Sequence, residues 1–191
     1  MQLTKNFTLA EFLQSDNAER AGGAILQAQL NPPPHIVANI KRQAEKIWQP
    51  CRDELGYQID ISSGYRCPEL NAITAGSSDT SQHTKGEAGD TKLKTTFFGG
   101  ALFEIRKQIE AITGKPLRSN VNANFYLFAW LCINIERMDI DQVIHEYGTD
   151  GAPAWVHGAC SETKNKRQIL IKRTGEGYKI LTLKEALMLG C

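Results

Sequence analysis

One polar segment with two glycines constrains this chain more than any other part of it. The segment runs from Ser81 to Asp90, and it places His83 seven positions before Asp90 with Gly86 and Gly89 between them. Ligands on one helix face lie three or four positions apart, so this spacing does not suit a helical pair. Glycines permit tight backbone bends. The segment therefore predicts that the chain bends near Gly86 and returns Asp90, in a strand, beside His83.

A second histidine, His157, follows Asp90 by 67 positions in the tripeptide Trp155-Val156-His157. Two imidazoles and one carboxylate form a ligand set that suits Zn²⁺, and a hydrolytic zinc has three protein ligands and one open position. His83, Asp90 and His157 are therefore the candidate metal ligands. On spacing alone, a polar surface loop with an incidental histidine stays open as the alternative.

Two further motifs flank these residues. Ser63-Gly64-Tyr65-Arg66 lies upstream, and Asp141-Gln142-Val143-Ile144-His145-Glu146 lies shortly before Trp155. In this order, the motifs resemble those of the zinc D-Ala-D-Ala carboxypeptidase family, which shares its fold with the hedgehog signalling domain. The resemblance covers roughly residues 3 to 181, and the Glu at the end of the second motif is similar to the phage-type branch of the family.

The resemblance implies a zinc metallopeptidase, a hydrolase that cleaves peptidoglycan stem peptides. The cleavage is either that of a D-Ala-D-Ala carboxypeptidase or that of an endopeptidase that cuts L-Ala-D-Glu or a cross-link. A phage-type cell-wall hydrolase, a bacteriophage endolysin for example, fits both. The alternative is a zinc-binding structural module, weak or inactive in catalysis, of a virion or a larger assembly, with assembly partners of its own.

The resemblance also implies roles for four residues outside the ligand set. Arg66 has a guanidinium suited to a carboxylate or a developing oxyanion, or it is a structural arginine that holds its turn. Ser81, Tyr65 and Trp155 are the candidate substrate-binding residues. For Ser81, holding its own loop in place is the alternative, and for Trp155, packing in the core is an equal alternative.

The catalytic base is the point where this chain departs from the better-known family pattern. Those enzymes carry Asp or Glu three positions before the last histidine ligand, whereas this chain has Ala154 there. A zinc peptidase needs a carboxylate that takes a proton from the attacking water. Glu146 is the preferred candidate and Asp150, in a turn, is the second. A site that has no base at all is the third possibility, which puts activity in doubt.

The other histidines and the cysteines have less specific settings. His145 alternates with Glu146 on a strand and is expected to face away from it, at the surface or behind a ligand. His35, beside a proline run, is expected at the surface. The five cysteines show no metal-binding spacing and are expected to be reduced thiols, and a contact between Cys67 and Cys160 is left open.

Periodicity and turn signals predict an α+β fold, in which helices flank a small, mainly antiparallel sheet. We expect one domain over residues 1–191, with a helical part at about 1–56, the sheet and metal site at about 57–181 and a short helix at 182–191. A short helix is expected to begin near Leu9, in a region that Gly22 and Gly23 interrupt or end. The other expected elements are helices at about 35–55 (kinked at Pro50), 68–75, 103–112, 124–132 and 182–189, strands at 57–62, 89–94, 141–147 and 155–159, and a hairpin of 167–172 with 177–181.

Charge and composition exclude some partners. The net charge is +1 and the sequence has no basic stripe interleaved with aromatic residues, so no nucleic-acid partner is expected. No apolar run approaches 18 residues, so no membrane insertion is expected. The first residues lack the apolar core of a signal peptide. We therefore expect synthesis in the cytoplasm and action on the cell wall after release, or from a virion.

Overall fold

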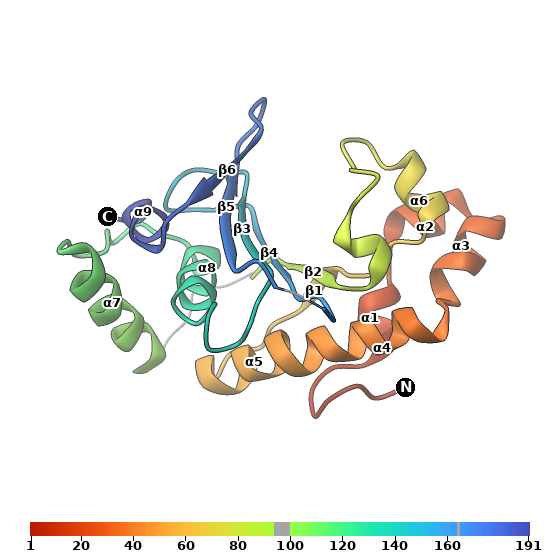
Figure 1. Cartoon of the computed structure of the whole chain (residues 1–191), viewed down its shortest axis with the longest axis horizontal. Helices are drawn as coiled ribbons and strands as arrows, with labels where there is room; N and C mark the ends of the chain where they lie inside the picture. The colour runs from red at the N-terminus through yellow and green to blue at the C-terminus, as the bar shows by residue number, and fades with distance from the viewer. Residues whose placement is uncertain (94–99, 164) are drawn as a thin grey trace.

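The computed structural model describes residues 1–93, 100–163 and 165–191, and it has the α+β fold that the sequence predicts (Figure 1). The helices are α1 (Leu9–Leu13), α2 (Asp16–Ala21), α3 (Gly23–Leu30), α4 (Pro34–Gln43), the π-helical turn η1 (Ala44–Trp48), α5 (Gln49–Leu55), α6 (Pro68–Ile73), the 3₁₀ turn η2 (Gln82–Lys85), α7 (Gly100–Thr113), α8 (Ala123–Ile133) and α9 (Leu183–Met188). The strands are β1 (Ile61–Ser63), β2 (Ala88–Thr91), β3 (Gln142–Glu146), β4 (Trp155–Ala159), β5 (Gln168–Lys172) and β6 (Tyr178–Leu181). Lys94, the last residue of an expected strand, lies outside the described residues.

The six strands form one sheet in the order β1-β2-β4-β3-β5-β6. Neighbours are antiparallel except β3 and β5, which are parallel. The expected hairpins β3–β4 and β5–β6 are confirmed by their registers. The register also places Asp90, His157, Ile144, Leu170 and Ile180 opposite one another in one row across five strands. Because side chains directly opposite share a face of a sheet, this row defines the face that carries the candidate ligands.

The other face of the sheet packs on helices (Figure 1). Trp48, at the end of η1, lies against Gly158 of β4, where a Cβ atom would come within 3.0 Å of the indole. Further along the sheet, Phe128 of α8 packs edge-on against His145 of β3, and α9 lies beside β5 and β6. One hydrophobic cluster joins residues of the N-terminal helices to residues of the sheet and of α8. The helices therefore form a rigid backing for the face that carries the ligands.

The helix expected at 35–55 is continuous but not uniformly α-helical. Its middle turn, η1, is a π turn in which the Gln49 N–H bonds to the Ala44 carbonyl, directly before Pro50. A proline cannot donate to the helical ladder, and a π turn is one way for a helix to adjust locally. The helix ends as expected at Gly56, which has a left-handed conformation. No helix in the described ranges is long and apolar enough to cross a membrane.

Gly64 marks a close approach between the turn after β1 and helix α1. A Cβ atom there would lie 2.5 Å from the Phe12 carbonyl oxygen and 2.7 Å from the Phe12 Cα, both backbone atoms that cannot rotate away. We expect Gly64→Ala to destabilise the protein by about 1–3 kcal/mol, the usual cost of overpacking. Urea unfolding measures this. Gly177→Ala is the control, since a Cβ atom there meets nothing within 4 Å, and an equal effect of the two variants would contradict the prediction.

Candidate metal centre

Two of the candidate ligands come from the segment between Ser81 and Asp90. The turn η2 carries His83, and Gly86 directly after it adopts a left-handed conformation with φ of 67°. The chain then enters β2, which carries Asp90. The next strand in the sheet, β4, brings His157 opposite Asp90. The bend at Gly86 and the return of Asp90 beside His83 thus follow the course expected from the glycine positions.

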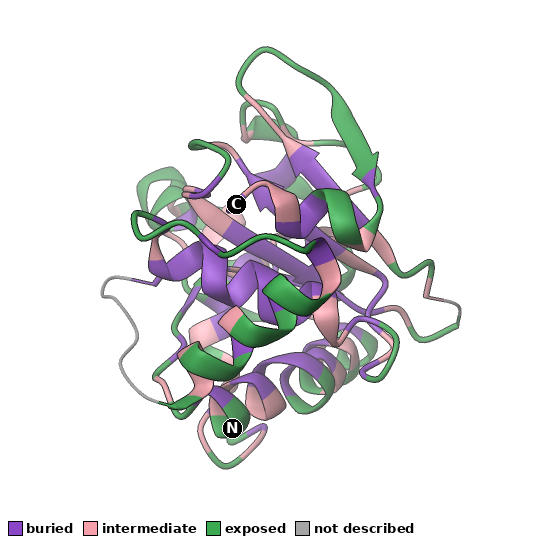
Figure 2. Ribbon diagram, turned by 90° about the vertical axis from the view of Figure 1, so that its left-hand side faces the viewer, coloured by how far each residue is buried: buried purple, intermediate pink, exposed green. Residues whose placement is uncertain are grey.

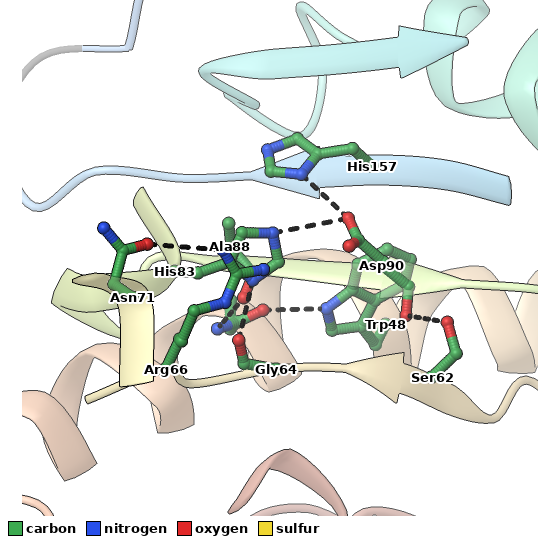
Figure 3. A network of polar contacts seen from close by, with 10 residues as sticks. Trp48, Ser62, Gly64, Arg66, Asn71, His83, Ala88, Asp90 and His157 are labelled. Carbon is green, nitrogen blue, oxygen red and sulfur yellow. Dashed lines mark hydrogen bonds and ion pairs between the residues drawn. The ribbon is translucent and has the colours of Figure 1, made fainter. Parts of the chain in front are cut away.

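The three side chains converge on one point of the sheet face (Figure 3). Nδ1 of His157 lies 2.9 Å and Nε2 of His83 lies 3.4 Å from Oδ1 of Asp90. One ligand atom from each residue lies within 4.8 Å of the others. Ligands at about 2.0–2.1 Å from a tetrahedral zinc are roughly 3.3–3.4 Å apart. The group therefore has the size and the donor atoms to hold a metal ion of this kind.

A hydrogen bond fixes which nitrogen of His83 faces the centre. Nδ1 of His83 lies 2.7 Å from the Gly64 carbonyl oxygen, which can only accept, so this nitrogen carries the proton (Figure 3). The lone pair of Nε2 is then free and points toward Asp90. Metal-binding histidines usually hold their second nitrogen in this way. The backbone of the Ser63–Arg66 turn therefore orients one ligand of the candidate centre.

The charges within the group favour an ionised carboxylate. Burial alone would raise the pKa of Asp90, but the hydrogen bonds and charges of His83 and His157 hold the pKa well below its usual range. Burial lowers the pKa of His157. For His83, burial acts in the same direction, but the Asp90 carboxylate more than offsets it and the pKa is raised. Asp90 is thus ready to bind a cation, as a ligand must be.

Buried amide side chains hold the segments that carry these residues. Gln43 of α4 has no exposed surface, and its Nε2 donates to the carbonyl oxygens of Gly86 and Ala88, at 2.8 and 3.1 Å. Its Oε1 accepts from the indole N–H of Trp48 at 3.0 Å. Both ends of the link between His83 and Asp90 are therefore fixed to the long helix.

Two other amides do the same for neighbouring segments. Gln29 of α3 donates to the Tyr65 carbonyl oxygen at 2.7 Å and accepts from the Cys67 N–H at 2.9 Å, so it holds the turn on both sides of Arg66. Asn124 of α8 donates to the Ala154 carbonyl oxygen at 3.0 Å, directly before β4. None of these three amides was predicted from the sequence. The sequence signal that could have found them is an amide residue at a helix position where the apolar periodicity predicts a buried side chain.

A cleft of about 1010 Å³ opens over this face of the sheet. It brings together the three candidate ligands and four other residues singled out from the sequence, namely Arg66, Ser81, Glu146 and Trp155. The segment 74–83 lies along one side of the cleft, and β3 to β6 form its floor. Trp155 lines this cleft and packs on Tyr147 with ring centroids 5.0 Å apart, so it belongs to the cleft rather than to the core.

Glu146 ends β3 directly opposite Trp155, two register pairs away from Ile144 and His157 and therefore on the same face of the sheet. Only 7% of its surface is exposed. Burial, and next the negative charge of Asp90, raise the pKa of Glu146 to about 7. A carboxylate with a pKa near neutrality can accept and release a proton at physiological pH. Asp150, the second candidate for the base, is exposed, pairs with Arg173 and is not among the residues that line the cleft.

Arg66 reaches the cleft from the turn that follows β1. Its guanidinium donates to Oδ1 of Asn71 at 3.3 Å, and its backbone N–H donates to the His83 carbonyl oxygen at 3.1 Å (Figure 3). Burial lowers the pKa of Arg66, although Asp90 counteracts this shift. In the described part of the chain no carboxylate lies within ion-pair distance of its guanidinium. A partly buried guanidinium in this setting is suited to an anionic or polarised oxygen of a ligand.

Tyr65 lies in a different environment from the one that the sequence predicted. Tyr65 is 5% exposed and is not one of the described residues that line the cleft, since its backbone bonds to Phe12 and Gln29 turn it into the core.

His145 does face away from Glu146, but the expectation of a surface position is wrong. It is 1% exposed, and its Nε2–H donates to the Asp150 carbonyl oxygen at 3.0 Å. His35 is exposed as expected. All five cysteines are free thiols, Cys67 and Cys160 included.

A family model described as Peptidase M15 matches residues 5–115. The matched range contains Arg66, His83 and Asp90 and ends before β3 and β4, so Glu146 and His157 are placed at the site by the structure alone. No curated protein and no solved structure matches this chain.

Proposed function

Because this chain belongs to the peptidase M15 family, we propose that it is a zinc peptidase of the phage type that cleaves the stem peptides of peptidoglycan. Membership of this family supports the activity of a zinc-dependent metallopeptidase that acts on peptidoglycan. The observation that carries the proposal to this chain is the convergence of His83, Asp90 and His157 in a cleft that is also lined by Glu146 and Arg66.

Each of these residues has a distinct part in the proposal. His83, Asp90 and His157 would hold Zn²⁺, which when bound would supply Lewis-acid polarisation of the scissile carbonyl and lower the pKa of water. Glu146 takes a proton from the attacking water and passes it to the leaving amine. Arg66 stabilises negative charge on the substrate oxygen or carboxylate. Ser81 and Trp155, which both line the cleft, contact the substrate.

Ala154 motivates the second candidate, a zinc-binding structural module of a virion or larger assembly. One experiment separates the two. Purified sacculi are incubated with the zinc-loaded protein, with and without a chelator, and new peptide termini are identified by mass spectrometry. New termini that disappear with the chelator support the peptidase, and they also identify the bond. Stoichiometric zinc without any new terminus supports the structural module.

Arg66 provides a quantitative test of the proposed chemistry. We expect Arg66→Ala to lower turnover by about 10²–10³-fold, as the loss of a positioned oxyanion donor does. Arg66→Lys should not restore the rate, because lysine lacks the planar fork of donors. Steady-state kinetics and elemental analysis together measure this. Full activity of Arg66→Ala with normal zinc content would instead make Arg66 a structural residue of its turn. Arg173→Ala, at a surface ion pair, is the control.

A further inference from the structure

The cleft floor continues well beyond the candidate metal ligands. The row that starts with Asp90 and His157 continues through Ile144, Leu170 and Ile180 to the edge strand β6. A second, parallel row holds the side chains of Trp155, Glu146, Lys172 and Tyr178. The floor therefore has an apolar row that leads away from the metal ligands, beside a row that contains the candidate base between aromatic residues.

The outer end of this floor is exposed and apolar. Tyr178 and Ile180 are 59% and 61% exposed, and both belong to the edge strand, which is exposed over most of its length (Figure 2). Large apolar side chains that share an exposed surface continuous with a cleft commonly mark a binding site. We call the surface formed by Tyr147, Trp155, Tyr178 and Ile180 the aromatic shelf.

Tyr147 adds an independent observation. It has a φ of 52°, a left-handed conformation that is unusual for a bulky residue, and this conformation accompanies the packing of its ring on Trp155 in the cleft. Its N–H bonds to the Lys172 carbonyl oxygen at 2.7 Å and keeps it there. Backbone strain of this kind concentrates at binding and active sites. The strain thus lies at the end of the cleft where the shelf begins.

The dimensions of the shelf indicate how much substrate it can hold. From β4 to β6 there are three strand spacings of about 4.8 Å, a distance of roughly 14 Å. An extended peptide covers roughly 3.3–3.6 Å per residue, so about four residues would be needed to cross it. A substrate that ended at the scissile bond, or one residue after it, would leave the outer part of the shelf, Tyr178 and Ile180 on β6, empty.

The chemistry of the shelf favours sugar over further peptide. Stem peptides carry carboxylates and amino groups, but Lys172 is the one cation of the two rows, and its ammonium already bonds to the Glu176 carbonyl and lies over the Tyr178 ring. Pyranose rings present flat faces of C–H groups, which suit the electron-rich faces of aromatic rings. Acetyl and lactyl methyl groups suit Ile180 and Leu170.

We propose that the aromatic shelf binds the glycan strand of peptidoglycan, so that the enzyme acts on stem peptides that are still attached to sugar. This proposal rests on the proposed function for its reaction, but the shelf can bind sugar whether or not a peptide is cut. Binding of a remote group that is equally strong in the ground state and the transition state acts on KM.

The test compares two soluble substrates with the same stem peptide, one bearing an N-acetylglucosaminyl-N-acetylmuramoyl group and one bearing an acetyl group. We expect kcat/KM of the wild type to be about tenfold higher or more for the sugar-bearing substrate, mainly through KM. Tyr178→Ala should bring the ratio close to one, and Tyr178→Phe, which keeps the ring, should retain it. Phe103→Ala removes an equally exposed ring on α7, away from the cleft, and should leave the ratio unchanged.

Calorimetry with the tetramer of N-acetylglucosamine tests the shelf without catalysis. We expect binding to the wild type and at least about tenfold weaker binding to Tyr178→Ala. If neither peptide is cleaved but the tetramer binds in this way, the proposed function fails and the sugar-binding shelf stands. If the two peptides are cleaved equally well by the wild type and the tetramer does not bind, the peptidase stands and the shelf proposal is overturned. Loss of the ratio in Tyr178→Phe as well would overturn the role of the ring.

Discussion

Replacing His83 with alanine is expected to remove zinc from the protein almost completely. The wild type should hold about one zinc per chain, because three donors converge within 4.8 Å on a buried face of the sheet. With one imidazole missing, two ligands remain, too few for a stable site. Elemental analysis after dialysis measures the metal, and the sacculus assay should show no cleavage by the same variant.

Unfolding provides a second readout of the same prediction. A metal ion that binds only the native state stabilises the protein by about 2.7 kcal/mol when its free concentration is a hundredfold above its Kd. Chelation should therefore lower the unfolding temperature of the wild type and leave that of His83→Ala unchanged. His35→Ala is the matched control, since it removes an exposed histidine from α4. Retention of stoichiometric zinc by both His83→Ala and His157→Ala would rule out the proposed centre.

Glu146→Gln is expected to lower the rate of cleavage by about 10²-fold or more while zinc content and stability stay normal. Glutamine keeps the size of the side chain and can accept a hydrogen bond, but it cannot take a proton. The β3–β4 register places this side chain two pairs away from His157 on the same face of the sheet, and a pKa of about 7 suits proton transfer near neutral pH. Single-turnover kinetics on a defined stem peptide measures the effect on the chemical step.

Asp150→Asn is the matched control for the base. Asp150 is exposed and its ion pair with Arg173 lies at the surface, where such pairs contribute little. We expect a nearly unchanged rate. If Glu146→Gln cleaves as fast as the wild type, the base is another group. If the wild type cleaves no stem peptide with zinc bound, Ala154 marks a site without a base.

Local signals in the sequence predicted most of the elements. The capping boxes at Thr8 and Thr182 are present in the structure, each with its glutamate three positions later. Both hairpins were predictable because strand alternation and turn residues act over a few positions. The parallel pairing of β3 with β5 was not, because nothing local to either strand specifies a partner that follows a crossover.

The site shows the same division between local and long-range information. The bend at Gly86 follows from glycine, and the alternation along β3 predicted that His145 and Glu146 face opposite sides. Alternation does not show which face of the strand is exposed to solvent, so the burial of His145 against Phe128 could not be predicted. The position of Tyr65 depends on Gln29, which is 36 residues away, and that contact exists only in the folded chain.

The bonds of Gln43 limit which residues position 43 can hold. The side chain there must offer two hydrogens, to Gly86 and Ala88, and one acceptor, to the Trp48 indole, from a site with no access to water. Glutamate has no hydrogens to donate, asparagine is one methylene shorter, and an apolar residue would leave two carbonyls and an indole N–H without partners. Relatives that share this helix and loop should therefore vary little at this position, and a library randomised at codon 43 should return glutamine almost alone.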